Sequence, residues 1–228
     1  MTLVKTCGKL YWAGEYAILE PGQLALIKAI PIYMTAEITA SDDYRLYSDM
    51  FTYSVDMRPD SSYALIQETV ALVEEYLTVQ GVKLQPFSLD IRGKMEREGK
   101  KFGLGSSGSV VVLVIKAMLA FYGRPVDREF LFKLASAVLL KCGDNGSMGD
   151  IACIVSEDLV LYQSFDREKV AHWLEKEDLQ PVLERDWGFS IESVEPGLEF
   201  DFLVGWTKEV AVSSHMVKQI KNHMDASF

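Results

Sequence analysis

The sequence contains a serine- and glycine-rich segment with the properties of a phosphate-binding loop. Residues 101–109 read Lys-Phe-Gly-Leu-Gly-Ser-Ser-Gly-Ser and lead directly into an apolar stretch with helical spacing, about 106–122. Glycines let the backbone approach a ligand closely, and the first N–H groups of a helix have no partners within it. The helix dipole also favours negative charge at that end. We therefore predict that backbone N–H groups of residues 105–109 bind phosphate.

The hydroxyls of Ser106 and Ser107 could bind a phosphate or a magnesium ion. The segment has no Gly-Lys-Ser/Thr ending, so it is not a Walker A motif, and it does not match the dinucleotide-binding fingerprint. The alternative interpretation is a serine-capped helix after a flexible turn.

A second glycine-rich segment, residues 143–150, reads Gly-Asp-Asn-Gly-Ser-Met-Gly-Asp. Its two carboxylates, Asp144 and Asp150, are six positions apart. This composition suits a site where an aspartate approaches a substrate hydroxyl or a metal ion. The alternative is an ordinary turn with solvated acids.

A third segment, residues 8–16, reads Gly-Lys-Leu-Tyr-Trp-Ala-Gly-Glu-Tyr. Its Lys9 lies among apolar residues of a predicted strand. A buried lysine needs a partner or loses its proton, and Asp150 is a chemically suitable partner. The alternative is a lysine at the solvated end of a strand.

The elements that must position these segments indicate an α+β protein with a mixed sheet and packed helices. The phosphate loop is predicted at a helix N-terminus. β-branched and aromatic residues dominate the predicted strands, and apolar residues recur at helical spacing in the predicted helices. The predicted strands are 3–12, 24–28, 31–39, 44–48, 51–55, 86–92, 158–163 and 199–206, with Pro31 marking the break before the third. The predicted helices are 62–79, 106–122, 127–141, 168–178 and one from Ser213, and 93–105 is predicted as a loop.

The composition excludes several classes of protein. The chain has 228 residues, 49% of them hydrophobic and 25% charged, which is typical of a globular protein. A net charge of -10 argues against nonspecific nucleic-acid binding. Cys7, Cys142 and Cys153 lack zinc-site spacing. The longest apolar run, residues 110–115, is too short to cross a bilayer. We expect a cytoplasmic protein with no membrane partner, and the sequence does not indicate its oligomeric state.

Together, in this order, the three segments resemble the GHMP kinases. The family has an N-terminal Gly-Lys…Gly-Glu-His/Tyr segment, which is similar to residues 8–16. Its phosphate loop typically reads Pro-x-x-x-Gly-Leu-Gly-Ser-Ser-Ala, and here residues 103–108 read Gly-Leu-Gly-Ser-Ser-Gly without the proline. Its Ser-Gly-x-Asp element is similar to Ser-Met-Gly-Asp at 147–150, with the glycine shifted by one position.

Within the family the chain looks most like the bacterial phosphomevalonate kinases, and residues 205–214 extend that resemblance. The resemblance implies that ATP, with Mg²⁺, phosphorylates 5-phosphomevalonate to 5-diphosphomevalonate. The family also has a second glycine-rich loop in a C-terminal domain, and this sequence ends before any such loop. We therefore expect an N-terminal portion of the enzyme, with residues 1–200 as the ATP-binding domain and 201–228 as the start of the C-terminal domain.

The resemblance also implies roles for individual residues. Lys9 and Asp150 are the implied catalytic residues, and Ser107 is the implied Mg²⁺ ligand. The ATP phosphates are assigned to Gly103, Leu104, Gly105, Ser106, Ser107, Gly108 and Ser109. The acceptor is assigned to Lys101, Ser147, Lys208 and Ser213. Three alternatives stay open: a mevalonate kinase, another small-molecule kinase of this family, or a nucleotide-binding fragment without catalysis.

Overall fold

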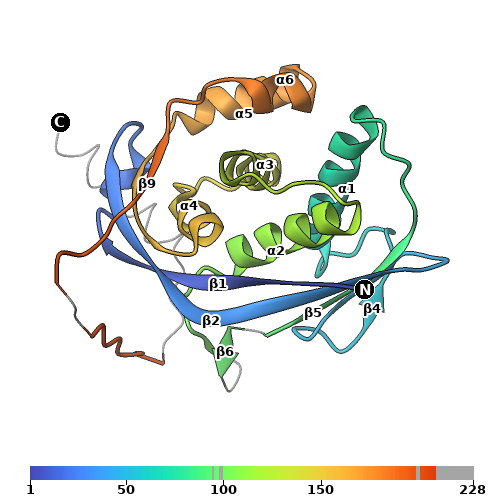
Figure 1. Cartoon of the computed structure of the whole chain (residues 1–228), viewed down its shortest axis with the longest axis horizontal. Helices are drawn as coiled ribbons and strands as arrows, with labels where there is room; N and C mark the ends of the chain where they lie inside the picture. Colours follow the sequence, from blue (N-terminus) through green and yellow to red (C-terminus); the bar gives the residue numbers. More distant parts are fainter. Residues whose placement is uncertain (94, 98–99, 199–200, 209–228) are drawn as a thin grey trace.

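The computed structural model describes residues 1–93, 95–97, 100–198 and 201–208, and its main feature is a mixed sheet with helices on one face (Figure 1). In the described part the sheet has seven strands in the order β4-β3-β5-β2-β8-β9, and β1 pairs with β2. The β3–β5 pair is parallel and the others are antiparallel. The strands are β1 (Thr2–Ala13), β2 (Leu24–Ala40), β3 (Arg45–Ser48), β4 (Ser54–Val55), β5 (Phe87–Arg92), β8 (Leu159–Gln163) and β9 (Ser190–Ser193).

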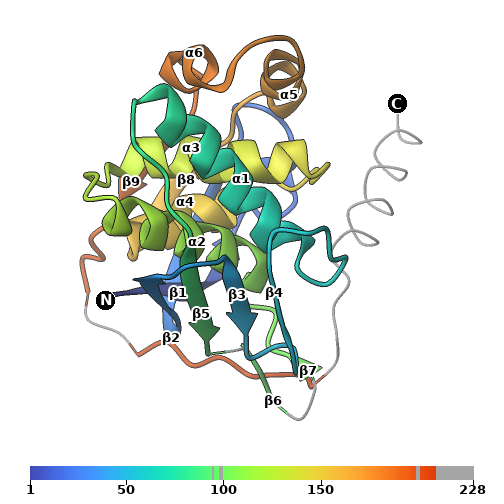
Figure 2. The same cartoon turned by 90° about the vertical axis from the view of Figure 1, so that its right-hand side faces the viewer.

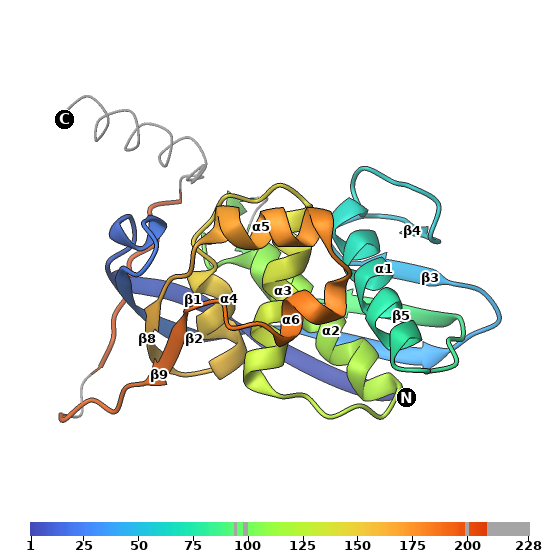
Figure 3. The ribbon, with the colours of Figure 1, turned by 90° about the horizontal axis from the view of Figure 1, so that it is seen from above.

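The helices cover the sheet in successive layers. α2 and α4 lie closest to β1 and β2, α3 lies above them, and α5 and α6 form the outermost layer (Figures 1 and 3). The helices are η1 (Ala17–Leu19), α1 (Ala64–Val79), α2 (Ser106–Phe121), α3 (Arg128–Lys141), α4 (Gly149–Ser156), α5 (Arg167–Lys176) and α6 (Leu179–Glu184). No helix among the described residues is long and apolar enough to cross a membrane.

The central helix α2 is apolar on nearly all sides because other elements surround it. Every residue from 108 to 115 is buried. α2 contacts β1 and β2 on one side and α1, α3 and α4 on the others. A helix packed in this way needs no polar face. Burial of the helix body fixes the position of its N-terminus, where the glycine- and serine-rich segment begins.

Strand β2 is a single long strand, so the prediction of two strands separated by Pro31 is wrong. β1 pairs with it along nearly its whole length, with a register shift where Cys7 faces Tyr33 and Gly8 faces Ile30. The shift leaves two residues of β2, Pro31 and Ile32, without partners on β1. A bulge tolerates proline because its missing N–H is not needed by the ladder.

Other predictions differ from the structure. A short hairpin of β6 (Glu96–Arg97) and β7 (Lys100–Lys101) lies in the stretch predicted as a loop, and it projects from the bottom of the sheet in Figure 2. Helix α4 was not predicted, and only its first two residues belong to the glycine-rich segment 143–150. The predicted strand at 199–206 is wrong over 201–206, which has no regular structure. The helix predicted from Ser213 lies outside the described residues, and the domain boundary at residue 200 stays a prediction.

Candidate active site

Strand β1 and the phosphate loop are in direct backbone contact. The Lys9 N–H donates to the Leu104 carbonyl at 3.0 Å. A Cβ placed on Gly8 would lie 3.0 Å from the Leu104 Cβ, so glycine allows this close approach. Lys9 is therefore fixed at its backbone beside the loop that precedes α2.

The loop turns into α2 through two glycines in the left-handed region. Gly103 and Gly105 both have φ of 77°, and Gly105 is the N-cap of α2. Ser106 is half-buried and Ser107 is exposed at the first turn. The N–H groups of the first turn have no acceptor within the helix. This end of α2 can therefore donate hydrogen bonds to an anion.

Ser109 does not belong with the phosphate donors. Its N–H donates to the Gly105 carbonyl at 3.0 Å, and its buried hydroxyl donates to the Cys7 carbonyl at 2.8 Å. The Thr6 hydroxyl in turn donates to the Ser109 carbonyl at 3.1 Å. These bonds tie α2 to β1, so the predicted role of Ser109 in ATP binding needs correction: it positions the loop from behind.

Asp150 lies in the first turn of α4, next to the first turn of α2. A Cβ on Gly108 would lie 2.8 Å from Asp150 Oδ2. A Cβ on Gly105 would lie 2.8 Å from Lys9 Cε and 3.5 Å from Asp150 Cβ. The structure thus brings Lys9, the phosphate loop and Asp150 together. The sequence had offered Asp150 only as a chemically suitable partner of Lys9.

Burial and charge act in opposite directions on Asp150. Burial raises the pKa of its carboxyl above the ordinary value of 3.8, and the Lys9 ammonium lowers it in part. The Ile151 N–H, which donates to Asp150 Oδ1 at 2.9 Å, also lowers this pKa in part. Raised pKa values of buried acids are common at functional sites.

The 143–150 segment is held to the sheet by two tyrosines that the sequence analysis did not single out. Tyr11 Oη and Ser147 Oγ are 2.9 Å apart. The Tyr162 hydroxyl donates to the Ser147 carbonyl at 2.9 Å. Ser147 is buried, with 7% of its surface exposed. The sequence could have indicated Tyr11, because side chains two positions apart on a strand share a face and Tyr11 follows Lys9 by two.

The other predicted acceptor residues are only partly placed. The backbone of Lys101 is in β7, and its side chain is not among those described. Lys208 is exposed, with φ of 61°. Ser213 lies outside the described residues.

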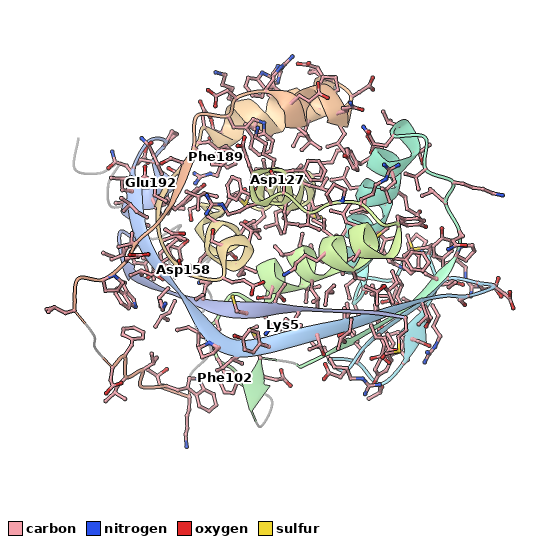
Figure 4. All side chains as sticks on the ribbon, viewed as in Figure 1. Lys5, Phe102, Asp127, Asp158, Phe189 and Glu192 are labelled. Atoms are coloured by element: carbon pink, nitrogen blue, oxygen red, sulfur yellow. The ribbon has the colours of Figure 1, made fainter. Side chains whose placement is uncertain are left out.

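Aromatic contacts bring segment 201–208 to the phosphate loop and to strand β1. The Trp206 and Phe102 rings have centroids 5.0 Å apart, and those of Phe202 and Trp12 are 4.8 Å apart. Figure 4 shows Phe102 beside the β6–β7 hairpin, next to the start of the loop. Lys208 therefore follows by two positions a residue that touches this loop.

The described residues contain no cluster of three histidine, cysteine, aspartate or glutamate side chains that could hold a metal ion by themselves. The Ser107 hydroxyl and the Asp150 carboxylate, on facing helix ends, are hard oxygen donors of the kind Mg²⁺ prefers. They fit an ion that takes its remaining ligands from bound phosphates and water.

Comparisons with known proteins show what the chain is similar to. The family model described as "GHMP kinases N terminal domain" matches residues 64–158. The chain is 75% identical to the Streptococcus pneumoniae phosphomevalonate kinase solved with phosphomevalonate and AMPPNP, with a TM-score of 0.96, covering 97% of this chain and 68% of that one. A Listeria innocua protein is 30% identical, with a TM-score of 0.93, over 98% of this chain and 65% of that one.

The chain belongs to the GHMP kinase family. A curated relative, the phosphomevalonate kinase of Streptomyces sp. (strain CL190), is 28% identical over 236 residues. The match covers 93% of this chain and 63% of the Streptomyces protein, so the chain spans less than two thirds of that relative's length.

Proposed function

We propose that the protein to which this chain belongs transfers the γ-phosphoryl group of ATP to 5-phosphomevalonate, giving ADP and 5-diphosphomevalonate. The observation that carries the proposal is the meeting of Lys9, the N-terminus of α2 and Asp150 around Gly105 and Gly108. The Streptococcus pneumoniae enzyme, 75% identical, was solved with phosphomevalonate and an ATP analogue. That similarity supports the choice of acceptor.

Phosphoryl transfer requires mainly positioning and neutralisation of charge. We assign the ATP phosphates to the loop 103–108, with the free N–H groups at the start of α2 as donors. Ser107 is the proposed Mg²⁺ ligand, and Asp150 lies beside the next residue, Gly108. A bound Mg²⁺ ion would neutralise charge on the phosphates. Lys9 would hold the transferring phosphoryl group, because its ammonium can stabilise the charge on the equatorial oxygens.

In the reaction, a phosphate oxygen of 5-phosphomevalonate bonds to the γ-phosphorus while the bond from that phosphorus to the β,γ-bridging oxygen breaks. ADP leaves with the electron pair. The acceptor phosphate is largely ionised near pH 7, because the second pKa of a phosphate monoester is about 6. An ionised acceptor needs no strong base to remove a proton. The proposed role of Asp150 is therefore to orient the acceptor and to pair with Lys9.

The acceptor's own groups need cations and hydroxyls. We assign them to Lys101, Ser147, Lys208 and Ser213. Ser147 is supported by its place in the segment that carries Asp150. Lys208 is supported by the contact of Trp206 with Phe102. Lys101 is supported by its position at the entry to the loop.

A coupled ADP-release assay tests the proposal. With saturating Mg-ATP we expect ADP formation to depend on 5-phosphomevalonate, and Asp150→Ala to lower kcat/KM by about a hundredfold or more, the cost of a misplaced reactant. Asp144→Ala is the matched control. Asp144 lies in the same segment, but it is exposed and accepts from the Gly146 N–H at 2.6 Å. Its charge contributes to the raised pKa of Asp150, so we expect Asp144→Ala to change kcat/KM far less than Asp150→Ala.

The other outcomes separate the alternatives. Stimulation by mevalonate alone would replace the proposal with a mevalonate kinase. ATP binding without turnover of either acceptor would leave a nucleotide-binding module. Equal losses of kcat/KM in Asp150→Ala and Asp144→Ala would refute the role assigned to Asp150.

A further inference from the structure

Tyr11 touches two residues of the proposed machinery at once. On β1 it lies two positions after Lys9 and on the same face of the strand. The Lys9 ammonium is 4.8 Å from the centroid of the Tyr11 ring. At the other end of the side chain, Tyr11 Oη is 2.9 Å from Ser147 Oγ. One side chain therefore links the proposed catalytic cation to a proposed acceptor ligand.

The hydrogen bonds around Ser147 favour one direction. The Gly149 N–H can only donate, and it points to Ser147 Oγ at 3.3 Å. Burial and the nearby Asp150 carboxylate raise the pKa of Tyr11, so its hydroxyl keeps its proton. If Tyr11 also donates to Ser147 Oγ, both acceptor positions of that oxygen are filled. The serine O–H is then free to point at an anionic oxygen.

The Tyr11 ring has little freedom to move. A Cβ on Gly149 would overlap Tyr11 Oη and would lie 2.8 Å from Ile27 Cδ1. The first residue of α4 and strand β2 thus confine the ring. A confined aromatic face restricts the position of a lysine ammonium, which otherwise rotates on a flexible four-carbon stem.

We propose that Tyr11 is a positioning residue for phosphoryl transfer: its hydroxyl orients Ser147 toward the acceptor, and its ring holds Lys9 toward the transferring group. This inference rests on the proposed function, because the acceptor is the ligand that Ser147 would meet. It goes beyond the assignment of Lys9 and Ser147 by stating what sets their geometry.

The test is a double-mutant cycle in the ADP-release assay. Tyr11→Phe keeps the ring and removes the hydroxyl. We expect it to raise the KM for 5-phosphomevalonate about fivefold, the effect of one hydrogen bond, with the KM for ATP and kcat nearly unchanged. In a Ser147→Ala background the same substitution should change that KM less than about twofold, because its partner is already gone.

Tyr162→Phe is the matched control. It also removes a tyrosine hydroxyl bonded to Ser147, but the bond is to the carbonyl, which Ser147→Ala retains. Its effect should therefore be the same in both backgrounds. Tyr11→Leu removes the ring as well, and we expect a further fall in kcat of at least about fivefold, because a partly buried cation–π contact is stronger than an exposed one. A purely structural role would lower the melting temperature without this separation of KM from kcat.

The outcomes distinguish the two proposals. If the wild-type chain is active with 5-phosphomevalonate but Tyr11→Phe acts equally in the presence and absence of the Ser147 hydroxyl, the role of Tyr11 is refuted and the function stands. If Tyr11→Phe changes only the melting temperature, the role is likewise refuted. If the wild-type protein does not turn over 5-phosphomevalonate, the proposed function fails, and this inference fails with it.

Discussion

Gly105 and Gly103 offer a comparison in which backbone strain is matched and only one contact differs. Both have φ of 77°, so alanine at either position adopts a left-handed conformation that costs about 1–2 kcal/mol. A Cβ at Gly103 would meet nothing within 4 Å. A Cβ at Gly105 would meet Lys9 Cε at 2.8 Å and Lys9 Cγ at 3.1 Å.

The contact at Gly105 decides the expected effect on activity. The 2.8 Å approach is about 0.6 Å shorter than ordinary contact, which begins at 3.4 Å. Lys9 cannot retreat as a whole, because its N–H is bonded to Leu104. Its side chain must therefore turn away. A displacement of about 1 Å at a reacting centre can cost about a hundredfold, so we expect that loss in kcat/KM for Gly105→Ala and less than about tenfold for Gly103→Ala.

Two measurements on both variants are needed. The ADP-release assay gives kcat/KM, and thermal unfolding gives the stability change. Both variants should lose about 2–8 °C in melting temperature, since each 1 kcal/mol shifts a chain of this size by about 2–4 °C. Equal values of kcat/KM for Gly103→Ala and Gly105→Ala would refute the argument that Gly105 is glycine in order to make room for Lys9.

Two further predictions follow from buried groups. Ser109→Ala removes the 2.8 Å bond to the Cys7 carbonyl and leaves that buried acceptor unpaired, so thermal unfolding should show a loss of about 1–3 kcal/mol; no change in stability would contradict the assigned link between α2 and β1. Asp150 has a raised pKa in the folded state, so the folded state binds its proton more tightly and this residue's contribution to stability falls as pH rises from 3.8. Asp150→Asn should therefore raise the melting temperature at pH 7, with the gain disappearing below pH 3.8; a lower melting temperature at pH 7 would contradict this sign.

The strongly patterned elements could be predicted from the sequence, and the failures have physical causes. α2 was predicted almost to the residue because a long apolar run follows a glycine-rich start. α4 was missed because it has only eight residues and follows Met148 as its N-cap, whose φ of 62° and lack of a capping side chain give no sequence signal. β2 was divided at Pro31 because a bulge depends on the partner strand and is not visible in one segment.

The site was predictable where it is local in the sequence. The phosphate loop and the position of Asp150 come from two short motifs. The neighbourhood of Tyr11 and Ser147 could not be derived, because the residues are 136 positions apart and only the packing of α4 on β1 brings them together. The role of Ser109 could not be predicted from the sequence either, because its hydroxyl bonds to strand β1 behind the helix.

The order in which β2 acquires its neighbours has a consequence for synthesis of the chain. Its N-terminal half pairs with β1 on one edge, but the other edge waits for β8, as Lys28 pairs with Leu159 about 130 residues later. At ~5–20 residues per second, a ribosome needs roughly 7–26 s to supply that strand. During this interval an apolar edge is open to other nascent chains. Lys28 lies within this edge, and a charged lysine on an edge strand is one of the features that discourage such pairing.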